Sequence, residues 1–429
     1  MTKSTEYPDI VEFMGPFYKY FYRQEGRELA DGYVVGLVMD GERKSVEPMS
    51  ARVNASERGM QRLLTQVKWE EKEVFREYRQ VMLAQTNDPQ GILAVDDTGF
   101  IKKGQDSVCV SRQYCGSSGK IDNCQIGVSM TYVGQGVAWP YCMDLFVPEK
   151  WDNLENPDCV AKRKKTRMPD KVRHKAKWRI ALEQIDIARA DGTLHRAVVA
   201  DSWYGNIPEF RQGLDERQEF YVVGVYSDTE VFLEQPVIEL APPQKKKRGR
   251  PRIRPLVENV RPSPVKVSDL GSRIAEDAWE HLELRKDSKG NPLISEAVSL
   301  RVWPAVGYRK GHLHEQVWLI VERRNNEGKG KELRYFFSNM PHDKPTIEMV
   351  RIYHERFWIE HGYQQLKEEL GMDHHEGRSW IGWHRHICLV FLAYGYLTWL
   401  RLREKKQKNI EAWRGWISQK TQVKRDMLG

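Results

Sequence analysis

The first part of the chain carries hydrophobic positions at helical spacing within a highly charged background. In the stretch that ends near residue 88, the apolar positions that share one helical face are Val74, Tyr78, Val81 and Met82. The run Pro89-Gln90-Gly91 then breaks the pattern, as Pro and Gly do between elements. We therefore predict a helical domain over residues 1–88.

A pattern of strands with intervening helices follows, between residues 89 and 226. The predicted strands cover residues 91–95, 107–114, 125–133, 197–200 and 219–225. The predicted helices lie near residues 178–188 and 208–214, before and after the fourth strand. Three consecutive strands followed by this alternation favour an α/β fold with a mixed sheet and flanking helices.

This pattern is interrupted over residues 227–345, which contain Pro-rich and Lys/Arg-rich sequence. The strand-like runs in this segment cover residues 297–303, 317–321 and 333–338. We interpret the segment as a mainly β insertion. Residues 346–400 return to helical patterns and complete the interrupted domain, and residues 401–429 form a basic carboxy-terminal tail.

Charge and composition narrow the possible partners and location. The 68 basic and 60 acidic residues give a net charge of +8, and the clustering of the excess predicts a polyanionic partner. The six cysteines include no Cys-x-x-Cys pair, so a zinc site is not expected. Scattered thiols without a secretory leader predict a reduced, cytoplasmic location. The longest apolar run, residues 387–400, predicts a buried helix that is too short to span a membrane.

A polar stripe on the helix predicted near residue 353 is the most unusual pattern in the chain. Its members, at offsets 0, 3, 7 and 14, are Tyr353, Arg356, Glu360 and Lys367. At about 100° per residue they fall within an arc roughly 60° wide. A carboxylate, two cations and a phenol on one face suit a surface that holds a metal beside phosphates. The alternatives are a solvated charge network, such as Arg356 with Glu360, and a core position for Tyr353.

Two further carboxylates end predicted strands, where sites in open α/β sheets gather. Asp96 follows the first strand and Asp201 the fourth, and the helix could lay Glu360 across them. Converging carboxylates repel one another unless cations lie between them, and oxygen ligands suit Mg²⁺ or Mn²⁺. We predict that these three residues are catalytic and hold two ions about 3.5–4 Å apart. Asp97 is the alternative to Asp96, and a turn or surface role is the alternative for each carboxylate taken alone.

These motifs resemble those of DDE transposases of the bacterial insertion-sequence class. Residues 353–367 match the class signature of Tyr, two residues, Arg, three residues, Glu, six residues and Lys without departure. Residues 96–98 resemble the Asp-x-Thr motif of the class, and Asp201 resembles its second aspartate. The likeness covers roughly residues 90–400 and implies an RNase H-like catalytic domain with a β-rich insertion. It also implies that the transposon end is gripped through its phosphates by Tyr353, Arg356 and Lys367.

Two basic segments are further candidates for DNA binding. The sequence Arg248-Gly249-Arg250-Pro251-Arg252 resembles an AT-hook, whose Gly and Pro keep the chain thin while Arg side chains enter a narrow minor groove. Residues 162–177, which include Lys164 and Lys165, predict contacts to phosphates. A solvated linker or a solvated basic face is the alternative for each.

The resemblance implies an enzyme that cleaves transposon ends with divalent metal ions and joins the free 3′-hydroxyls to target DNA. Its partners would be double-stranded DNA, at terminal inverted repeats and target sites, and a second copy of the chain in a homodimer on DNA. The location would be the bacterial cytoplasm, at the nucleoid. The amino-terminal helices are expected to bind the repeats, although they show no clean helix-turn-helix motif. The rival hypotheses are an RNase H-like nuclease without strand transfer and a non-catalytic DNA-binding protein descended from a transposase.

Overall fold

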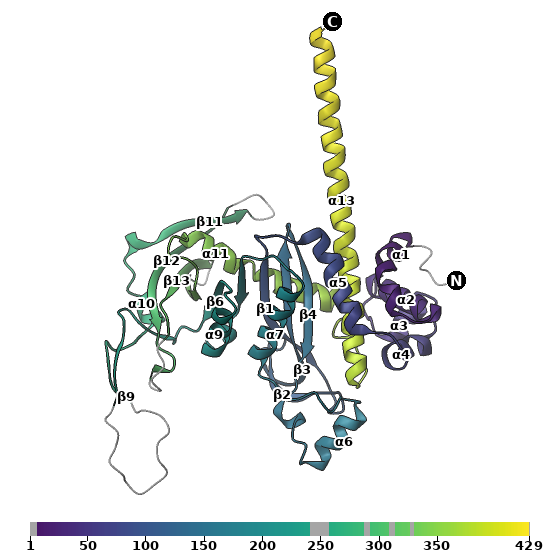
Figure 1. Cartoon of the computed structure of the whole chain (residues 1–429), viewed down its shortest axis with the longest axis horizontal. Coiled ribbons are helices and arrows are strands. Elements are labelled where there is room, and N and C mark those ends of the chain that lie inside the picture. The colour runs from purple at the N-terminus through teal and green to yellow at the C-terminus, as the bar shows by residue number, and fades with distance from the viewer. Residues whose placement is uncertain (1–6, 241–256, 287–291, 309–313, 327–329, 429) are drawn as a thin grey trace.

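A mixed sheet of twelve strands runs through the protein, with helices packed on its faces (Figure 1). The computed structural model describes residues 7–240, 257–286, 292–308, 314–326 and 330–428. The strand order is β10-β7-β12-β13-β14-β6-β5-β1-β3-β2, with β11 paired to β12 and β4 paired to β3. The prediction of a mixed α/β fold is confirmed, and most of the strand pairs are antiparallel.

The centre of the sheet contains the five strands that the hydrophobic pattern predicts, together with one further strand. Its strands are β1 (Ile92–Ile101), β2 (Ser111–Cys115), β3 (Lys120–Gly134), β4 (Val137–Leu145), β5 (Ala197–Ala200) and β6 (Tyr221–Val225). β1, β5 and β6 run parallel, and β3 pairs antiparallel with β1. Every residue of β5 and β6 is buried, which explains their continuous apolar sequence.

The strand β4 is the one central strand that the sequence pattern did not predict. It pairs with β3 along the edge of the sheet, and the register shifts between Met130 and Thr131, opposite Cys142 and Pro140. Proline cannot donate a hydrogen bond to a neighbouring strand and is therefore found at edges and irregularities. Pro140 interrupts the strand-like sequence of β4 at this irregularity.

Most of the described strands that follow residue 226 extend this sheet. They are β7 (Glu230–Phe232), β10 (Val265–Lys266), β11 (Glu280–Lys286), β12 (Pro292–Pro304), β13 (Val317–Asn326) and β14 (Gly330–Ser338), with β8 (Val237–Leu240) and β9 (Val257–Arg261) as a separate pair. β14 joins the sheet by pairing antiparallel with β6. The predicted β-rich character of this segment agrees with these strands.

Helices cover the sheet and form the amino-terminal part of the chain. They are α1 (Pro8–Met14), α2 (Gln24–Val38), α3 (Val46–Arg52), α4 (Glu57–Thr65), α5 (Glu71–Thr86), α6 (Pro157–Lys165), α7 (Lys177–Ala190), α8 (Ser202–Gly205), α9 (Pro208–Glu216), α10 (Val267–Gly271), α11 (Thr346–His354), α12 (Phe357–Gln364) and α13 (Trp380–Leu428). No helix among the described residues is long and apolar enough to cross a membrane.

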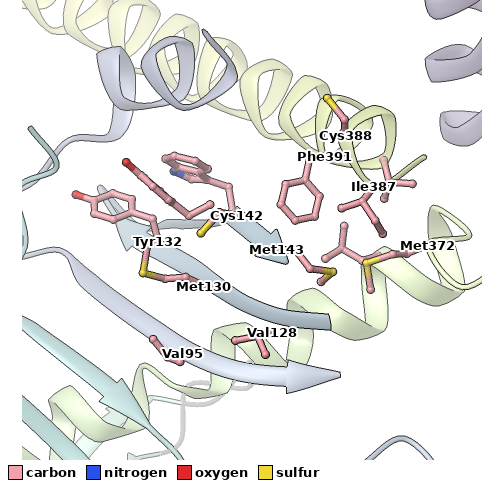
Figure 2. Packing of buried hydrophobic residues seen from close by; sticks show 14 of the residues in the cluster. Val95, Val128, Met130, Tyr132, Cys142, Met143, Met372, Ile387, Cys388 and Phe391 are labelled. Carbon is pink, nitrogen blue, oxygen red and sulfur yellow. The ribbon is translucent and has the colours of Figure 1, made fainter. Parts of the chain in front are cut away.

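The amino-terminal helices share a core with the sheet through α13. Figure 2 shows Met130, Cys142 and Met143 of the sheet facing Ile387 and Phe391 of α13. On α5, the Tyr78 ring packs edge-on against Trp139 of β4 at a centroid distance of 5.6 Å. The helical region before residue 88 is therefore packed against the rest of the fold and is not a detached module.

The basic residues after position 400 continue the helix that precedes them. α13 continues without a break through residue 400 to Leu428 and projects away from the body in Figure 1. The Lys, Arg, Glu and Gln residues after position 400 are strong helix formers, so nothing in the sequence ends the helix there.

A buried ionic cluster joins β13 to α11, the helix that begins the signature region. Glu322 is fully buried, and one of its carboxylate oxygens is 2.8 Å from Nε2 of His354 and 3.1 Å from Nε of Arg324. Ser295 Oγ donates to the same oxygen at 2.7 Å. The cluster fixes the end of α11 against the extended sheet.

Candidate active site

Asp96 and Asp201 occupy neighbouring positions on the same face of the sheet. Val95 of β1 is paired with Ala200 of β5, so the next residue on each parallel strand is one of the two aspartates. Side chains alternate between faces along a strand, so Asp96 shares the face of Ile92 and Ala94. Those residues belong to the apolar cluster that includes Ile352 of α11 and Ile359 of α12. Both aspartates therefore lie under the helices that carry the polar stripe.

Asp201 is held by the backbone of the helix that follows it. As the N-cap of α8, its Oδ1 accepts hydrogen bonds from the N–H groups of Trp203 at 3.0 Å and Tyr204 at 3.1 Å. α8 lies so close to β6 that a Cβ on Gly205 would stand 1.9 Å from the carbonyl oxygen of Gly224. This close packing fixes the position of the Asp201 carboxylate.

The Asp96 carboxyl group lies in a half-buried position. Its Oδ1 accepts from the backbone N–H of Asp97 at 2.7 Å, and its Oδ2 accepts from Arg356 Nη1 at 3.2 Å. Burial and then the charge of Asp201 raise the pKa of Asp96 to about 8, against the opposing effect of Arg356. Burial also raises the pKa of Asp201. A further cation between these carboxylates would favour their ionised forms.

Asp97 lies on the opposite face of β1 from Asp96. Its Oδ2 accepts from Nζ of Lys177, the first residue of α7, at 2.6 Å. The sequence offered both Asp96 and Asp97 as candidate metal ligands. Their side chains lie on opposite faces of β1, so that Asp96 faces Arg356 and Asp97 faces α7.

Glu360 is linked to Asp96 through Arg356 rather than by direct contact. Arg356 Nη2 donates to Oε1 of Glu360, while Nη1 reaches Asp96. The Glu360 side chain is 53% exposed, against 16% for Asp96, so it lies toward the outer rim of the site. The sequence left open a solvated charge network in which Arg356 pairs with Glu360, and this i, i+4 ion pair is present. Arg356 also contacts Asp96 on the sheet.

The polar stripe does not lie on one regular helix. α11 ends at His354, α12 begins at Phe357 with Arg356 as its N-cap, and residues 365–369 form a π-helical turn. The prediction of one continuous helix is therefore wrong in detail, because Arg356 and Lys367 lie at interruptions of the helical ladder. Such irregularities redirect side chains and are frequent at functional sites.

Tyr353 and Lys367 flank this centre in sheltered positions. The Tyr353 ring packs on Phe336 with centroids 4.0 Å apart, and burial raises the pKa of its phenol. Lys367 Nζ donates to the Gly99 carbonyl oxygen at 2.9 Å and to Ser117 Oγ at 2.6 Å. The core position considered for Tyr353 agrees with this packing, and Lys367 ties the signature segment to β1 and to the β2–β3 turn.

The donor set around Asp96 is composed of oxygen atoms, which is what hard divalent cations prefer. Among the described residues, no three His, Cys, Asp or Glu side chains approach closely enough to form a complete metal site. The guanidinium of Arg356 lies between the carboxylates of Asp96 and Glu360 and supplies the positive charge there. Two aspartate carboxylates on one face of the sheet suit a divalent cation, while Glu360 is paired with Arg356.

The basic run of residues 162–177 contains both exposed and buried side chains. Lys164 and Lys165 are exposed on α6, where Lys165 lies 3.2 Å from Asp106. Arg163 is buried and donates to the carbonyl oxygens of Trp151 and Val172, so a phosphate role for this member of the 162–177 run is wrong. The AT-hook-like Arg248, Arg250 and Arg252 lie outside the described residues.

Comparison with known proteins defines the family. Residues 16–291 match the family of DDE superfamily endonucleases, and the chain belongs to this superfamily. The match begins within the amino-terminal helices and contains Asp96 and Asp201. The chain is also 26% identical over 340 residues to the probable transposase for insertion sequence element IS701 of Microchaete diplosiphon, which covers 79% of this chain and 73% of that protein. These findings confirm the class that the motifs resemble.

Proposed function

We propose that the chain is a DDE transposase that cleaves the ends of an insertion sequence and transfers the freed 3′-hydroxyls to target DNA. The observation that carries the proposal is the register of β1 and β5, which sets Asp96 beside Asp201 beneath Arg356 and Glu360. Membership of the DDE superfamily and the likeness to an insertion-sequence transposase support it.

In this proposal the three acidic residues hold two divalent metal ions. The ions are Mg²⁺, and Mn²⁺ can substitute for them. Asp96 and Asp201 are fixed by backbone N–H groups and provide the rigid part of the site, while the more exposed Glu360 completes it from α12. Bound divalent cations would activate the attacking water or hydroxyl and stabilise charge on the phosphate and the leaving oxygen.

The cations of the signature segment would bind the DNA backbone. Arg356 offers two parallel N–H donors, which suit phosphate oxygens as well as the carboxylates it now contacts. Movement of Arg356 from the carboxylates to a phosphate would free Glu360 and couple DNA binding to completion of the site. Lys367 and Tyr353 would support this contact from either side.

The wider DNA contacts follow from the domain arrangement we propose. Residues 1–88 would contact the terminal inverted repeats, and residues 89–226 and 346–400 would form an RNase H-like catalytic domain. The segment 227–345 would be a β-rich insertion that adds a minor-groove contact through Arg248, Arg250 and Arg252, and residues 401–429 would be a basic tail. Lys164 and Lys165 on α6 would add phosphate contacts. Two copies of the chain would bring two transposon ends together.

A strand-transfer reaction tests this function. Short inverted repeats in the DNA that flanks the coding region would provide a labelled end substrate, which is incubated with the protein, Mg²⁺ and a target plasmid. The expected result is a joined product that is lost in the Glu360→Gln variant. Cleavage without joining would indicate the nuclease, binding alone would indicate the non-catalytic protein, and full cleavage by Glu360→Gln would refute the proposed role of Glu360.

A further inference from the structure

Lys177 lies behind the candidate active site, on the opposite face of the sheet from Arg356. Its ammonium donates to Asp97 Oδ2 at 2.6 Å and stands 4.1 Å from the centroid of the Trp203 ring. The side chains of Lys177 and Asp97 are 20% and 17% exposed. The ammonium is thus committed to two protein partners, and the phosphate contact predicted for the 162–177 run does not apply to it.

Each of the two partners of Lys177 donates a backbone hydrogen bond to one of the two aspartates, and Tyr204 is a second donor to Asp201. The N–H of Asp97 donates to Asp96 Oδ1 at 2.7 Å, and the N–H of Trp203 donates to Asp201 Oδ1 at 3.0 Å. One side chain therefore connects the supports of both carboxylates. Such outer contacts determine how well ligands are aimed at a metal.

The helix that carries Lys177 is firmly attached to the sheet. The buried Gln184 of α7 donates to the Val128 carbonyl oxygen at 2.9 Å and to Asp144 Oδ2 at 2.8 Å. These contacts fix α7 against β3 and β4, so its first residue is presented to β1 and α8 from a rigid element. Rigid support is what a positioning residue requires.

Lys177 also balances a charge that would otherwise disturb the site. Asp97 adds a third carboxylate beside Asp96 and Asp201, and like charges in partly buried positions destabilise one another. The ion pair with Lys177 compensates Asp97 and holds it on the far face of β1. Loss of this pair would free the Asp97 side chain to turn toward solvent and loosen the adjoining peptide.

We propose that Lys177 is a positioning residue whose ammonium, held between Asp97 and Trp203, aligns the carboxylates of Asp96 and Asp201 for metal binding. The inference rests on the proposed function, because it assumes that these two aspartates hold the metal. It assigns a role to Asp97 as well, as the anchor of Lys177 rather than a metal ligand.

The affinity of the full-length protein for Mn²⁺ without DNA, measured by electron paramagnetic resonance titration, tests this role. The Mn²⁺ site of interest is the one whose binding is lost in the Asp96→Asn variant. We expect Lys177→Met to raise the dissociation constant of this site by roughly 10- to 100-fold. Removal of a nearby positive charge alone would tighten binding of a cation, so the sign separates positioning from simple electrostatics. Lys177→Arg, which keeps the ion pair and ring contact, should restore affinity.

The matched control is Lys344→Met, which removes an equal charge from a lysine paired with Glu348 at the start of α11. It should bind Mn²⁺ like the unmodified protein. Unchanged or tighter binding by folded Lys177→Met would overturn the inference. If that variant does not fold, Trp203→Leu carries the same prediction without a change of charge, and unchanged binding there overturns it too. If Asp96→Asn itself retains all Mn²⁺ binding, the proposed function fails first.

Discussion

Asp96→Asn is expected to lower the rate of DNA strand cleavage by about 10³-fold, equivalent to roughly 4 kcal/mol of transition-state stabilisation. The amide keeps the size of the side chain and can still accept from the Asp97 N–H, but it removes the charge beside Asp201. Single-turnover cleavage of end-labelled transposon-end DNA in Mg²⁺ measures the effect, and thermal unfolding checks that the variant is folded.

The matched variant is Asp97→Asn, one residue along the same strand. Because Asp97 faces Lys177 rather than Arg356, its loss should reduce cleavage by only about 10-fold, through poorer alignment of the site. The ratio between the two variants is the informative quantity. Inactive Asp97→Asn with active Asp96→Asn would exchange the roles and contradict the placement of the metal on the face of α11 and α12.

Glu322→Ala is expected to destabilise the folded protein by about 3 kcal/mol. Glu322 is fully buried, and its removal leaves His354, Arg324 and Ser295 without the carboxylate that they share. Urea unfolding followed by circular dichroism gives the change in free energy. Glu183→Ala is the control, because the Glu183–Lys175 pair is about half exposed and such pairs contribute at most about 1 kcal/mol. Equal effects of the two variants would contradict the structural role of the cluster.

The effect of Glu322→Ala should also depend on pH. Burial alone would raise the pKa of Glu322, but His354 and then Arg324 outweigh it and lower the pKa from 4.5 to about 2. A carboxyl whose pKa is depressed in the folded state stabilises the protein above its ordinary pKa and loses that contribution as the pH falls toward the folded value. The difference between the unmodified protein and Glu322→Ala should therefore be full above about pH 5 and shrink between pH 4.5 and 2.

The central strands and the two aspartates follow from the sequence because buried strands leave a strong local pattern. The apolar runs before Asp96 and Asp201 predict β1 and β5, and their parallel pairing puts the aspartates side by side. Local hydrophobic patterns do not show which of Asp96 and Asp97 faces Asp201 and α12. This orientation depends on which face α7 and α12 cover, which is a property of the tertiary packing and not of local spacing.

The signature segment shows the opposite limit. Spacing predicts one helical stripe, yet the chain breaks between α11 and α12 and forms a π turn at Lys367. Neither interruption contains a Pro or a Gly, and Gly362 lies inside α12. The local sequence therefore does not predict the interruptions. Contacts of Arg356 with Asp96, and of Lys367 with Gly99, lie at the interruptions and connect them to β1.

The basic run before α7 shows how charge alone can mislead. The sequence of residues 162–177 predicts a uniform phosphate-binding surface. In the structure, however, Arg163 donates to the Trp151 carbonyl oxygen and Lys177 donates to Asp97. Both are distinguished from Lys164 only by burial. A count of positive charges predicts the class of partner, whereas the fold decides which charges remain for it.

The proposed metal site is tested most directly by an anomalous difference map from crystals of the protein with transposon-end DNA, grown in Mn²⁺. We predict a manganese peak bound by Asp96 and Asp201, with Glu360 turned toward it and Arg356 moved from the carboxylates to a DNA phosphate. A manganese peak held by Asp97 would contradict this site. The site would also be contradicted if DNA were bound at the scissile phosphate while Arg356 still bridged Asp96 and Glu360 and no manganese lay beside them.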